Sequence, residues 1–226
     1  MTHRYNRLAA GLIAATLALG AGAALAAADP ALDTAVSHLE RAWAHIHYEV
    51  KDPDAQYEAY KALADEAAKV VRQFPGKAEP LIWNGVIVST EAGVAGSFSA
   101  LGLAKDARAL FEAAEKIDPR AFDGAAPTSL GSLYYMVPGF PLGFGDDDKA
   151  RAFLERGLAI SPDGLDSNYF YGDFLYRQGE YAKARQVLTH ALAAAPNPDR
   201  PVWDAGRRAE IKAVLDQVQR KLASSN

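Results

Sequence analysis

Apolar side chains recur every three or four residues along most of this chain, a spacing that predicts amphipathic helices and an all-α fold. The clearest example runs from Leu165 to Pro196, where two helical patterns flank a Gly-Glu turn. Its residues have the offsets of a helix-turn-helix repeat of about 34 residues at Gly172, Gly179, Tyr181, Ala184, Leu188, Ala191 and Pro196. Gly172 and Ala184 are small where two antiparallel helices approach closely, and Gly179 tolerates the positive φ of a turn. We therefore expect a solenoid of helix pairs.

The same pattern extends to the rest of the chain with less regularity. Further helices are predicted over 31–50, 54–74, from 78 onward, over 104–117, from 128 onward, over 146–160 and over 204–222. The repeat that begins at Thr128 has its small and turn positions at Gly131, Ala150 and Pro162. The last helix follows a proline-rich linker, and we expect it to cap the array.

Gly93 and Gly96 lie in a run of small residues within the third predicted helix. They mark either a close approach between two helices or a break in the helix. Because a glycine inside a helix costs about 1 kcal/mol and usually has a packing reason, the close approach is the favoured interpretation.

The segment VPGFPLGFGD lengthens the turn of the repeat that begins at Thr128 by seven residues relative to the turn at 175–179. Its prolines and glycines predict a compact loop, but Phe140, Leu142 and Phe144 are apolar where loops are usually polar. These side chains either fold back between neighbouring helices or form part of a binding surface. Folding back is the favoured interpretation.

The offsets in 165–196 resemble those of the tetratricopeptide repeat (TPR), and the resemblance covers most of the chain with decreasing strength toward the N-terminus. It implies a TPR-like helix-turn-helix solenoid. The expected order is a degenerate pair at 27–77, a repeat array at 78–199 with an inserted loop at 136–145, and a capping helix at 200–226.

In such a solenoid the first helix of each pair lines a concave groove, which is where this resemblance implies a binding surface. The groove and loop candidates are Trp83, Asn84, Tyr134, Tyr135, Phe140, Phe144, Asn168, Tyr169 and Asp173. Tyrosine suits such a surface because it is large, stiff and amphipathic. At least half of the aromatic candidates are nevertheless expected to be ordinary repeat core.

The helical-pair array, with a Gly-Asp opening the helix at 146–160 after a long loop, is also similar to the T-component proteins of TRAP transporters. That resemblance implies an accessory protein that binds a small organic ligand. Members of that family are typically lipoproteins, whereas this chain has no cysteine that a lipid could modify.

The N-terminus has a basic start, a short apolar centre and an Ala-Leu-Ala finish, a combination that predicts a cleavable signal peptide over 1–26. Cleavage is expected after Ala26, with Ala28 as the rival site, and the protein is expected to be periplasmic or secreted. The net charge of −4 argues against nucleic acid and against an anionic membrane surface as partners. The absence of cysteine excludes disulfides and thiol catalysis.

The polar clusters of the chain have simple interpretations. Asp146–Asp148 opens a helix and is expected to cap it rather than bind calcium, and Asp166 or Ser167 is expected to cap the next helix. Three histidines in one predicted helix, His38, His45 and His47, lack the spacing of a zinc site. Glu91 is the one acid worth testing as a buried group, although a solvent-facing position is favoured.

No nucleophile elbow, phosphate loop, zinc-protease motif or dinucleotide fingerprint occurs in the sequence. The sequence therefore favours a binding protein with no cofactor, no metal and no catalysis of its own. The leading hypothesis is an exported scaffold that takes a protein or peptide partner in its groove. The alternative is a small-ligand-binding accessory of a periplasmic TRAP-type transporter, which an enclosed pocket with a convergent charge such as Arg151 or Arg177 would favour. An enzyme is a remote alternative.

Overall fold

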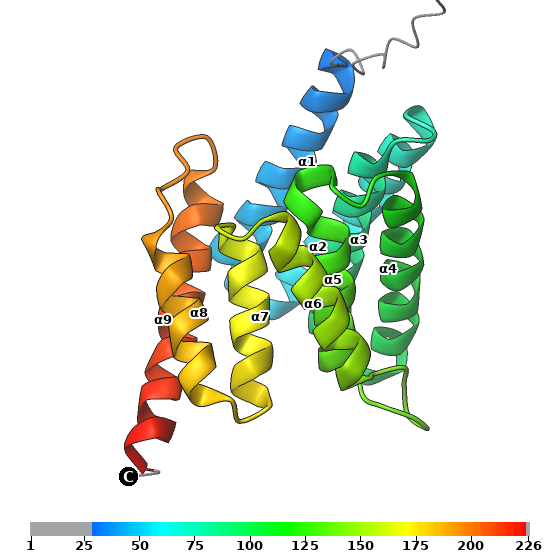
Figure 1. Cartoon of the computed structure of the whole chain (residues 1–226). Coiled ribbons are helices and arrows are strands. Elements are labelled where there is room, and N and C mark those ends of the chain that lie inside the picture. Colours follow the sequence, from blue (N-terminus) through cyan, green and yellow to red (C-terminus); the bar gives the residue numbers. More distant parts are fainter. Residues whose placement is uncertain (1–28, 225–226) are drawn as a thin grey trace, which may run out of the picture.

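The computed structural model describes residues 29–224 and, at positions 97 and 98, the backbone alone. The predicted signal peptide lies outside these residues. The described chain is all-α (Figure 1). Its helices are α1 (Pro30–Glu49), α2 (Pro53–Gln73), α3 (Ala78–Val94), α4 (Ser97–Ile117), α5 (Ala121–Met136), α6 (Asp147–Ile160), α7 (Leu165–Arg177), α8 (Tyr181–Ala193) and α9 (Pro201–Ser224).

Consecutive helices pack as antiparallel pairs, α1 with α2, α3 with α4, α5 with α6 and α7 with α8. Glycines allow three of these pairs to approach closely. A Cβ added to Gly172 would lie 2.5 Å from the Leu188 side chain, and the same addition at Gly131 would lie 2.6 Å from Leu154. A Cβ added to Gly85 would lie 2.7 Å from the Phe111 ring. The solenoid architecture and its small seam residues therefore agree with the sequence pattern.

Helix α9 does more than cover the end of the array. It packs on α8 and also turns back to contact α1 and α7, so that the first and last helices meet (Figure 1). Gly206 of α9 lies against the ring of Tyr48. At the same junction, His47 bonds both Tyr60 and Glu210 at 2.9 and 3.3 Å. The array is thereby closed into a compact body with an enclosed concave side.

The helix ends follow the capping chemistry of their sequences in part. Asp146 caps α6 as predicted, its Oδ1 accepting the amide of Lys149 at 3.0 Å. The prediction for α7 was wrong, because Gly164 precedes that helix and no side chain caps it. Ser167 instead donates back to the carbonyl of Ser161 at 2.6 Å, and Asp166 turns toward α9. Gly179 has a φ of 76° in the α7–α8 turn.

The expectation of close helix packing at Gly93 and Gly96 was wrong. A Cβ at either position would meet nothing within 4 Å, and α3 ends at Val94. These glycines lie at a break, after which α4 begins at Ser97, seven residues before the predicted start. No neighbouring element packs against either glycine, so close packing is not the reason for glycine at these positions.

Helix α5 also begins earlier than the predicted Thr128 and contains a kink in its first turn. Phe122, Asp123 and Gly124 have φ values of 47°, 56° and 79°, all in the left-handed region. A left-handed conformation costs roughly 1–2 kcal/mol for a residue with a Cβ. Phe122 and Asp123 are therefore held in a strained backbone by the structure around them.

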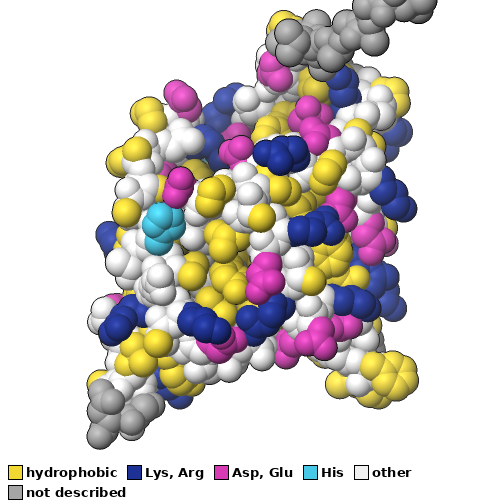
Figure 2. Space-filling view, viewed as in Figure 1, with side chains coloured by type: hydrophobic (Ala, Val, Ile, Leu, Met, Phe, Trp, Pro, Cys, Tyr) yellow, Lys and Arg dark blue, Asp and Glu magenta, His cyan; other side chains and the backbone are white. Residues whose placement is uncertain are grey.

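The α5–α6 loop divides its apolar residues between the core and the surface. Phe144 packs edge-on against Tyr134, with ring centroids 5.8 Å apart, and the Arg108 guanidinium lies 4.3 Å above its ring. Phe140 is 93% exposed and Leu142 is 74% exposed. Figure 2 shows the resulting hydrophobic projection at the lower right, where Figure 1 places this loop. Phe144 therefore folds back onto the helices as favoured, whereas Phe140 and Leu142 lie on the surface.

Candidate functional site

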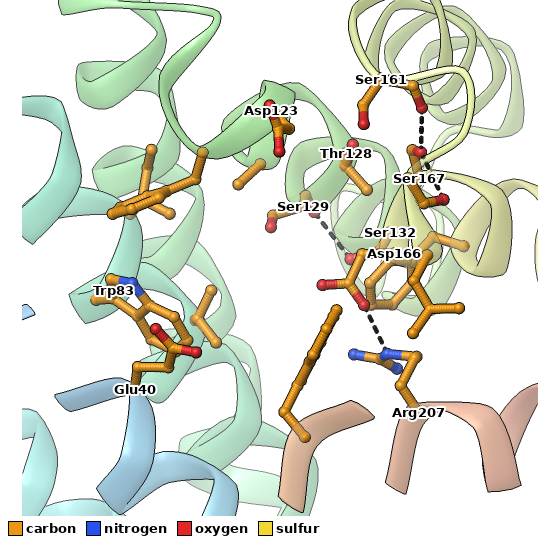
Figure 3. Close-up of a pocket in the computed structure, with 18 of the residues that line it drawn as sticks. Glu40, Trp83, Asp123, Thr128, Ser129, Ser132, Ser161, Asp166, Ser167 and Arg207 are labelled. Atoms are coloured by element: carbon orange, nitrogen blue, oxygen red, sulfur yellow. Dashed lines mark hydrogen bonds and ion pairs between the residues drawn. The ribbon is translucent and has the colours of Figure 1, made fainter. Parts of the chain in front are cut away.

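The concave side contains a partly enclosed cavity of about 230 Å³ (Figure 3). Its walls come from the odd-numbered helices α1, α3, α5, α7 and α9, with the α6–α7 turn and Arg200 completing the rim. These are the first helices of the pairs and the closing helix. The sequence pattern predicted that first helices would line the concave side, and the cavity lies there.

Two arginines form ion pairs on opposite sides of the cavity. On one side, the Arg200 guanidinium pairs with Glu40 of α1. On the other, Arg207 of α9 pairs through Nε with Asp166 of α7 at 2.6 Å and through a terminal nitrogen with Glu210 at 2.6 Å. The Arg207 side chain is only 8% exposed. These pairs fasten α9 to α1 and α7 around the cavity.

The electrostatics of the two arginines differ. Burial alone would lower the pKa of Arg207, but the carboxylates of Asp166 and Glu210 outweigh it and raise the pKa. Burial lowers the pKa of Arg200 to about 10, and the positive charge of Arg207 adds to this effect. Both guanidiniums are charged at neutral pH. Their partners compensate the cost of holding these charges away from water.

Aromatic rings make up much of the apolar wall. The cavity is lined by Trp43, Trp83, Trp203, Phe122 and Phe170, which include all three tryptophans of the chain. Trp43 donates its Nε1–H to Thr90 at 3.0 Å. The Trp83 nitrogen is buried and has no hydrogen-bond partner among the described residues. A buried donor of this kind is uncommon and marks a place where a bound group would be stabilised.

Helix α5 contributes hydroxyl groups and a carboxylate to the upper wall (Figure 3). Ser132 donates its hydroxyl to the Ser129 carbonyl at 2.9 Å, and both side chains line the cavity. Asp123, in the strained first turn, adds an exposed carboxylate. Strained residues are enriched at binding and active sites, so the kink is consistent with a functional role for this wall.

Of the nine groove and loop candidates named from the sequence, Trp83 alone lines the cavity. Asn84 is buried next to it on α3. Asn168 donates to the carbonyls of Pro162 and Gly164 at 2.7 and 2.9 Å and so stabilises the α6–α7 turn. Tyr134 is stacked on Phe153 between α5 and α6. None of these three positions is a free surface.

Tyr135 and Asp173 form a second polar cluster, between α5 and α7. The Tyr135 hydroxyl donates to Asp173 Oδ2 at 2.9 Å, and Arg177 Nε donates to the same oxygen at 2.9 Å. Burial and the adjacent Asp173 raise the pKa of Tyr135 well above its ordinary value. Tyr169 lies under the guanidinium of Arg207, 4.4 Å from its ring centroid, and burial raises its pKa to about 12. Neither Arg177 nor Arg151 lines the cavity.

Sequence reasoning missed the charged cavity residues, which are Glu40, Asp123, Asp166, Arg200 and Arg207. One signal was available. Trp203, Arg207 and Ile211 are spaced by four residues along α9, so the arginine occupies the apolar face of a helix. A charged residue in that position requires a buried partner. The sequence alone does not say which helix supplies that partner.

Glu91 corrects another expectation, because it is 6% exposed rather than solvent-facing. Burial raises the pKa of its carboxyl group, with Lys61 acting in the opposite direction. It lies outside the residues that line the cavity.

In the described part of the chain, no three His, Asp or Glu side chains are grouped so as to hold a metal ion. His45 pairs with Glu49 at 2.5 Å and His38 with Glu66 at 3.0 Å. Nor is any helix within 29–224 both long and apolar enough to cross a membrane.

Comparison with known proteins agrees with the repeat pattern. Residues 142–218 match the family model described as tetratricopeptide repeat. This part of the chain is similar to the tetratricopeptide repeat family. The match spans α6, α7 and α8, which include the clearest repeat offsets, and extends into α9. A TPR fold favours a protein-interaction scaffold.

Two solved structures are similar to this chain. A thermophilic TPR protein from Thermus thermophilus aligns with a TM-score of 0.51 and 20% identity, over 78% of this chain and 90% of its own. MamA aligns with a TM-score of 0.43 and 18% identity, over 78% of this chain and 97% of its own. No curated protein matches the sequence. The first likeness supports the all-α fold.

Proposed function

We propose that this chain is an exported TPR scaffold that binds a protein or peptide partner on its concave side, at the mouth of the cavity. The observation that carries the proposal is the placement of polar and aromatic side chains from every first helix around one hollow. Residues needed only to hold a solenoid together do not require buried ion pairs. A concave wall with mixed polar and aromatic chemistry is typical of sites where TPR-like arrays hold a partner segment.

The test is a change of charge at the mouth of the cavity. Asp123→Lys inverts an exposed lining charge that makes no side-chain hydrogen bond within the described residues, and Lys105→Glu on α4 is the matched control away from the cavity. Partners are to be captured by crosslinking in the native compartment and identified by mass spectrometry. A protein adduct that Asp123→Lys removes and Lys105→Glu retains supports the scaffold. An adduct that is insensitive to both changes places the partner elsewhere on the molecule.

Export forms part of this proposal. The basic, apolar and Ala-Leu-Ala segments of residues 1–26 support it. Intact-mass measurement of the protein isolated from its source gives the mature N-terminus, which we expect at Ala27. A mass that includes residues 1–26 contradicts export through a cleaved signal peptide.

A second candidate function is a small-ligand-binding accessory protein, as the T-component resemblance implies. The specific observation that favours it is enclosure, because α9 folds back on α1 and leaves a cavity of about 230 Å³ rather than an open channel. Small-molecule sites are usually concave, largely preformed and supplied with a few convergent polar groups. Native mass spectrometry of the gently purified protein separates the two functions. A retained mass of a few hundred daltons supports the ligand, and a protein-sized adduct supports the scaffold.

A further inference from the structure

We propose that the cavity binds one small, uncharged ring compound that carries several hydroxyl groups, of the size and chemistry of a monosaccharide or a cyclic polyol. This inference rests on the second candidate function and names the chemical class of its ligand. It is drawn from the charges, the aromatic faces and the unpaired donor of the cavity.

The charges of the cavity disfavour an anionic ligand. Three carboxylates line it, those of Glu40, Asp123 and Asp166, against the guanidiniums of Arg200 and Arg207. Glu210 adds a further negative charge directly behind Arg207. Because carboxylates outnumber guanidiniums, an entering acid meets a surplus of like charge, and both arginines already have carboxylate partners.

The aromatic faces disfavour a cationic ligand. Cations bind over the faces of indole and phenyl rings, but three of the five rings that line this cavity, Trp83, Trp203 and Phe170, already lie against guanidiniums. Arg200 lies 3.9 Å above the Trp203 ring and 5.9 Å from that of Trp83. Arg207 lies 4.9 Å from the Phe170 ring centroid. A second cation at these rings meets the positive charge of the arginine that occupies them.

A neutral ring with several hydroxyl groups fits the remaining hydrogen-bonding groups and apolar surface of the cavity. The paired carboxylates keep lone pairs that accept hydroxyl hydrogens, and the Ser129 and Ser132 hydroxyls line the wall formed by α5 (Figure 3). Trp83 is 7% exposed, and its buried Nε1–H lacks a partner among the described residues, so a ligand oxygen would satisfy it after a small shift of the surrounding side chains. The remaining indole surface is apolar and covers the C–H face of such a ring. Donors, acceptors and a flat apolar wall thus converge around one hollow.

The size of the cavity restricts the ligand to a single ring. Pockets that hold drug-sized molecules are about 300–1,000 Å³, and this cavity of about 230 Å³ lies below that range. An oligosaccharide or a folded peptide segment does not fit inside it. The cavity therefore suits one monosaccharide unit with most of its surface enclosed.

The experiment uses the mature wild-type protein and matched ring compounds. The neutral probes are glucose, galactose and myo-inositol, and the charged probes of the same size are glucuronate and glucosamine. Intrinsic tryptophan fluorescence is a direct readout, because all three tryptophans line the cavity, and a thermal shift is the second. We expect at least one neutral probe to bind at millimolar concentration or below, and glucuronate and glucosamine to bind at least about tenfold more weakly than the best neutral probe.

Two variants test the site. Trp83→Phe keeps an aromatic ring but removes the unpaired N–H, and we expect it to weaken Kd for the neutral ligand about tenfold. Tyr135→Phe is the control, because it removes a hydroxyl between α5 and α7 outside the cavity and leaves Kd unchanged. If Trp83→Phe does not fold, Ser129→Ala removes a lining hydroxyl and tests the same wall.

The outcomes separate this inference from the function on which it rests. If no neutral probe changes either readout, or if a charged probe binds as tightly, the neutral-ring inference is wrong. A charged small molecule retained in native mass spectrometry then still supports a small-ligand function. If no small molecule is retained and no probe binds, both the inference and the second candidate function fail.

Discussion

The close approach of α7 and α8 can be tested with a single added methyl group. A Cβ at Gly172 would lie 2.5 Å from both Cγ and Cδ2 of Leu188, which is 0% exposed and cannot move into solvent. Overpacking of this kind costs about 1–3 kcal/mol. Replacing a helix-interior glycine with alanine contributes about 1 kcal/mol in the opposite direction. We therefore expect Gly172→Ala to lower the free energy of unfolding by up to about 2 kcal/mol.

Gly102 in α4 supplies the matched control. It is also inside a helix, but a Cβ there would meet nothing within 4 Å, so Gly102→Ala should show the helix gain of about 1 kcal/mol alone. For a domain of this size, 1 kcal/mol corresponds to about 2–4 °C in Tm. Thermal unfolding followed by circular dichroism should then place Gly172→Ala below the wild type and Gly102→Ala above it.

A double-mutant cycle tests whether contact with Leu188 causes the destabilisation by Gly172→Ala. Leu188→Ala alone should cost about 2–5 kcal/mol because it leaves a cavity in the core. In that background the added methyl at residue 172 meets no side chain of residue 188, so Gly172→Ala should become stabilising. If Gly172→Ala raises Tm in the wild type as much as Gly102→Ala does, the proposed close seam is refuted. A Gly172→Leu change should unfold this helix pair altogether.

Three further changes test the burial of polar and apolar groups elsewhere. Burial raises the pKa of Glu91, so the folded state binds its proton more tightly than the unfolded state, and wild-type stability falls as pH rises above about 4.5. The Tm of Glu91→Gln relative to the wild type should therefore increase between pH 4 and pH 7. An equal Tm difference at the two pH values would contradict the burial. Phe140→Ala should change stability by no more than about 0.5 kcal/mol, whereas Phe144→Ala in the same loop should cost at least about 1 kcal/mol in urea unfolding; equal effects would contradict the different packing of the two rings. Arg207→Met should cost about 1–3 kcal/mol, because it leaves the partly exposed carboxylates of Asp166 and Glu210 without their guanidinium partner; a neutral effect in the same assay would show that these charges do not depend on the arginine.

The repeat architecture was predictable because the residues that determine it are close together in the sequence. Gly172, Ala184 and Gly179 lie within one helix pair, and their required sizes and backbone angles follow from that pair alone. The Asp146 cap is likewise a matter of neighbouring residues. By contrast, the open space at Gly93 and Gly96 depends on which elements pack nearby, and the helical pattern carries no information about that. Glycine at a break and glycine at a close seam look identical in sequence.

The cavity was not predictable for the same reason. It exists because α9 folds back to α1, a contact between residues far apart in the chain. Cysteine spacing or a binding motif would have linked such distant elements, but neither is present. The candidates chosen from the C-terminal ends of α5 and α7, Tyr134, Tyr135 and Asp173, are used in contacts between neighbouring helices. The cavity takes its α5 residues from 122–132 and its α7 residues from 165–170, which precede these candidates along each helix.

Several residues around the cavity are arranged in ways that do not maximise the stability of the fold. Phe122 and Asp123 hold a left-handed backbone at the edge of the cavity, at a cost of roughly 1–2 kcal/mol each. Replacing a buried ion pair by well-packed apolar residues is often neutral or stabilising, so Arg207 and Asp166 are not the most stable way to join α7 to α9. An apolar plug would also fill the hollow and bury Trp83 without leaving its N–H unpaired. Three departures from maximal stability thus coincide at one cavity, which is the pattern that the proposed binding function predicts.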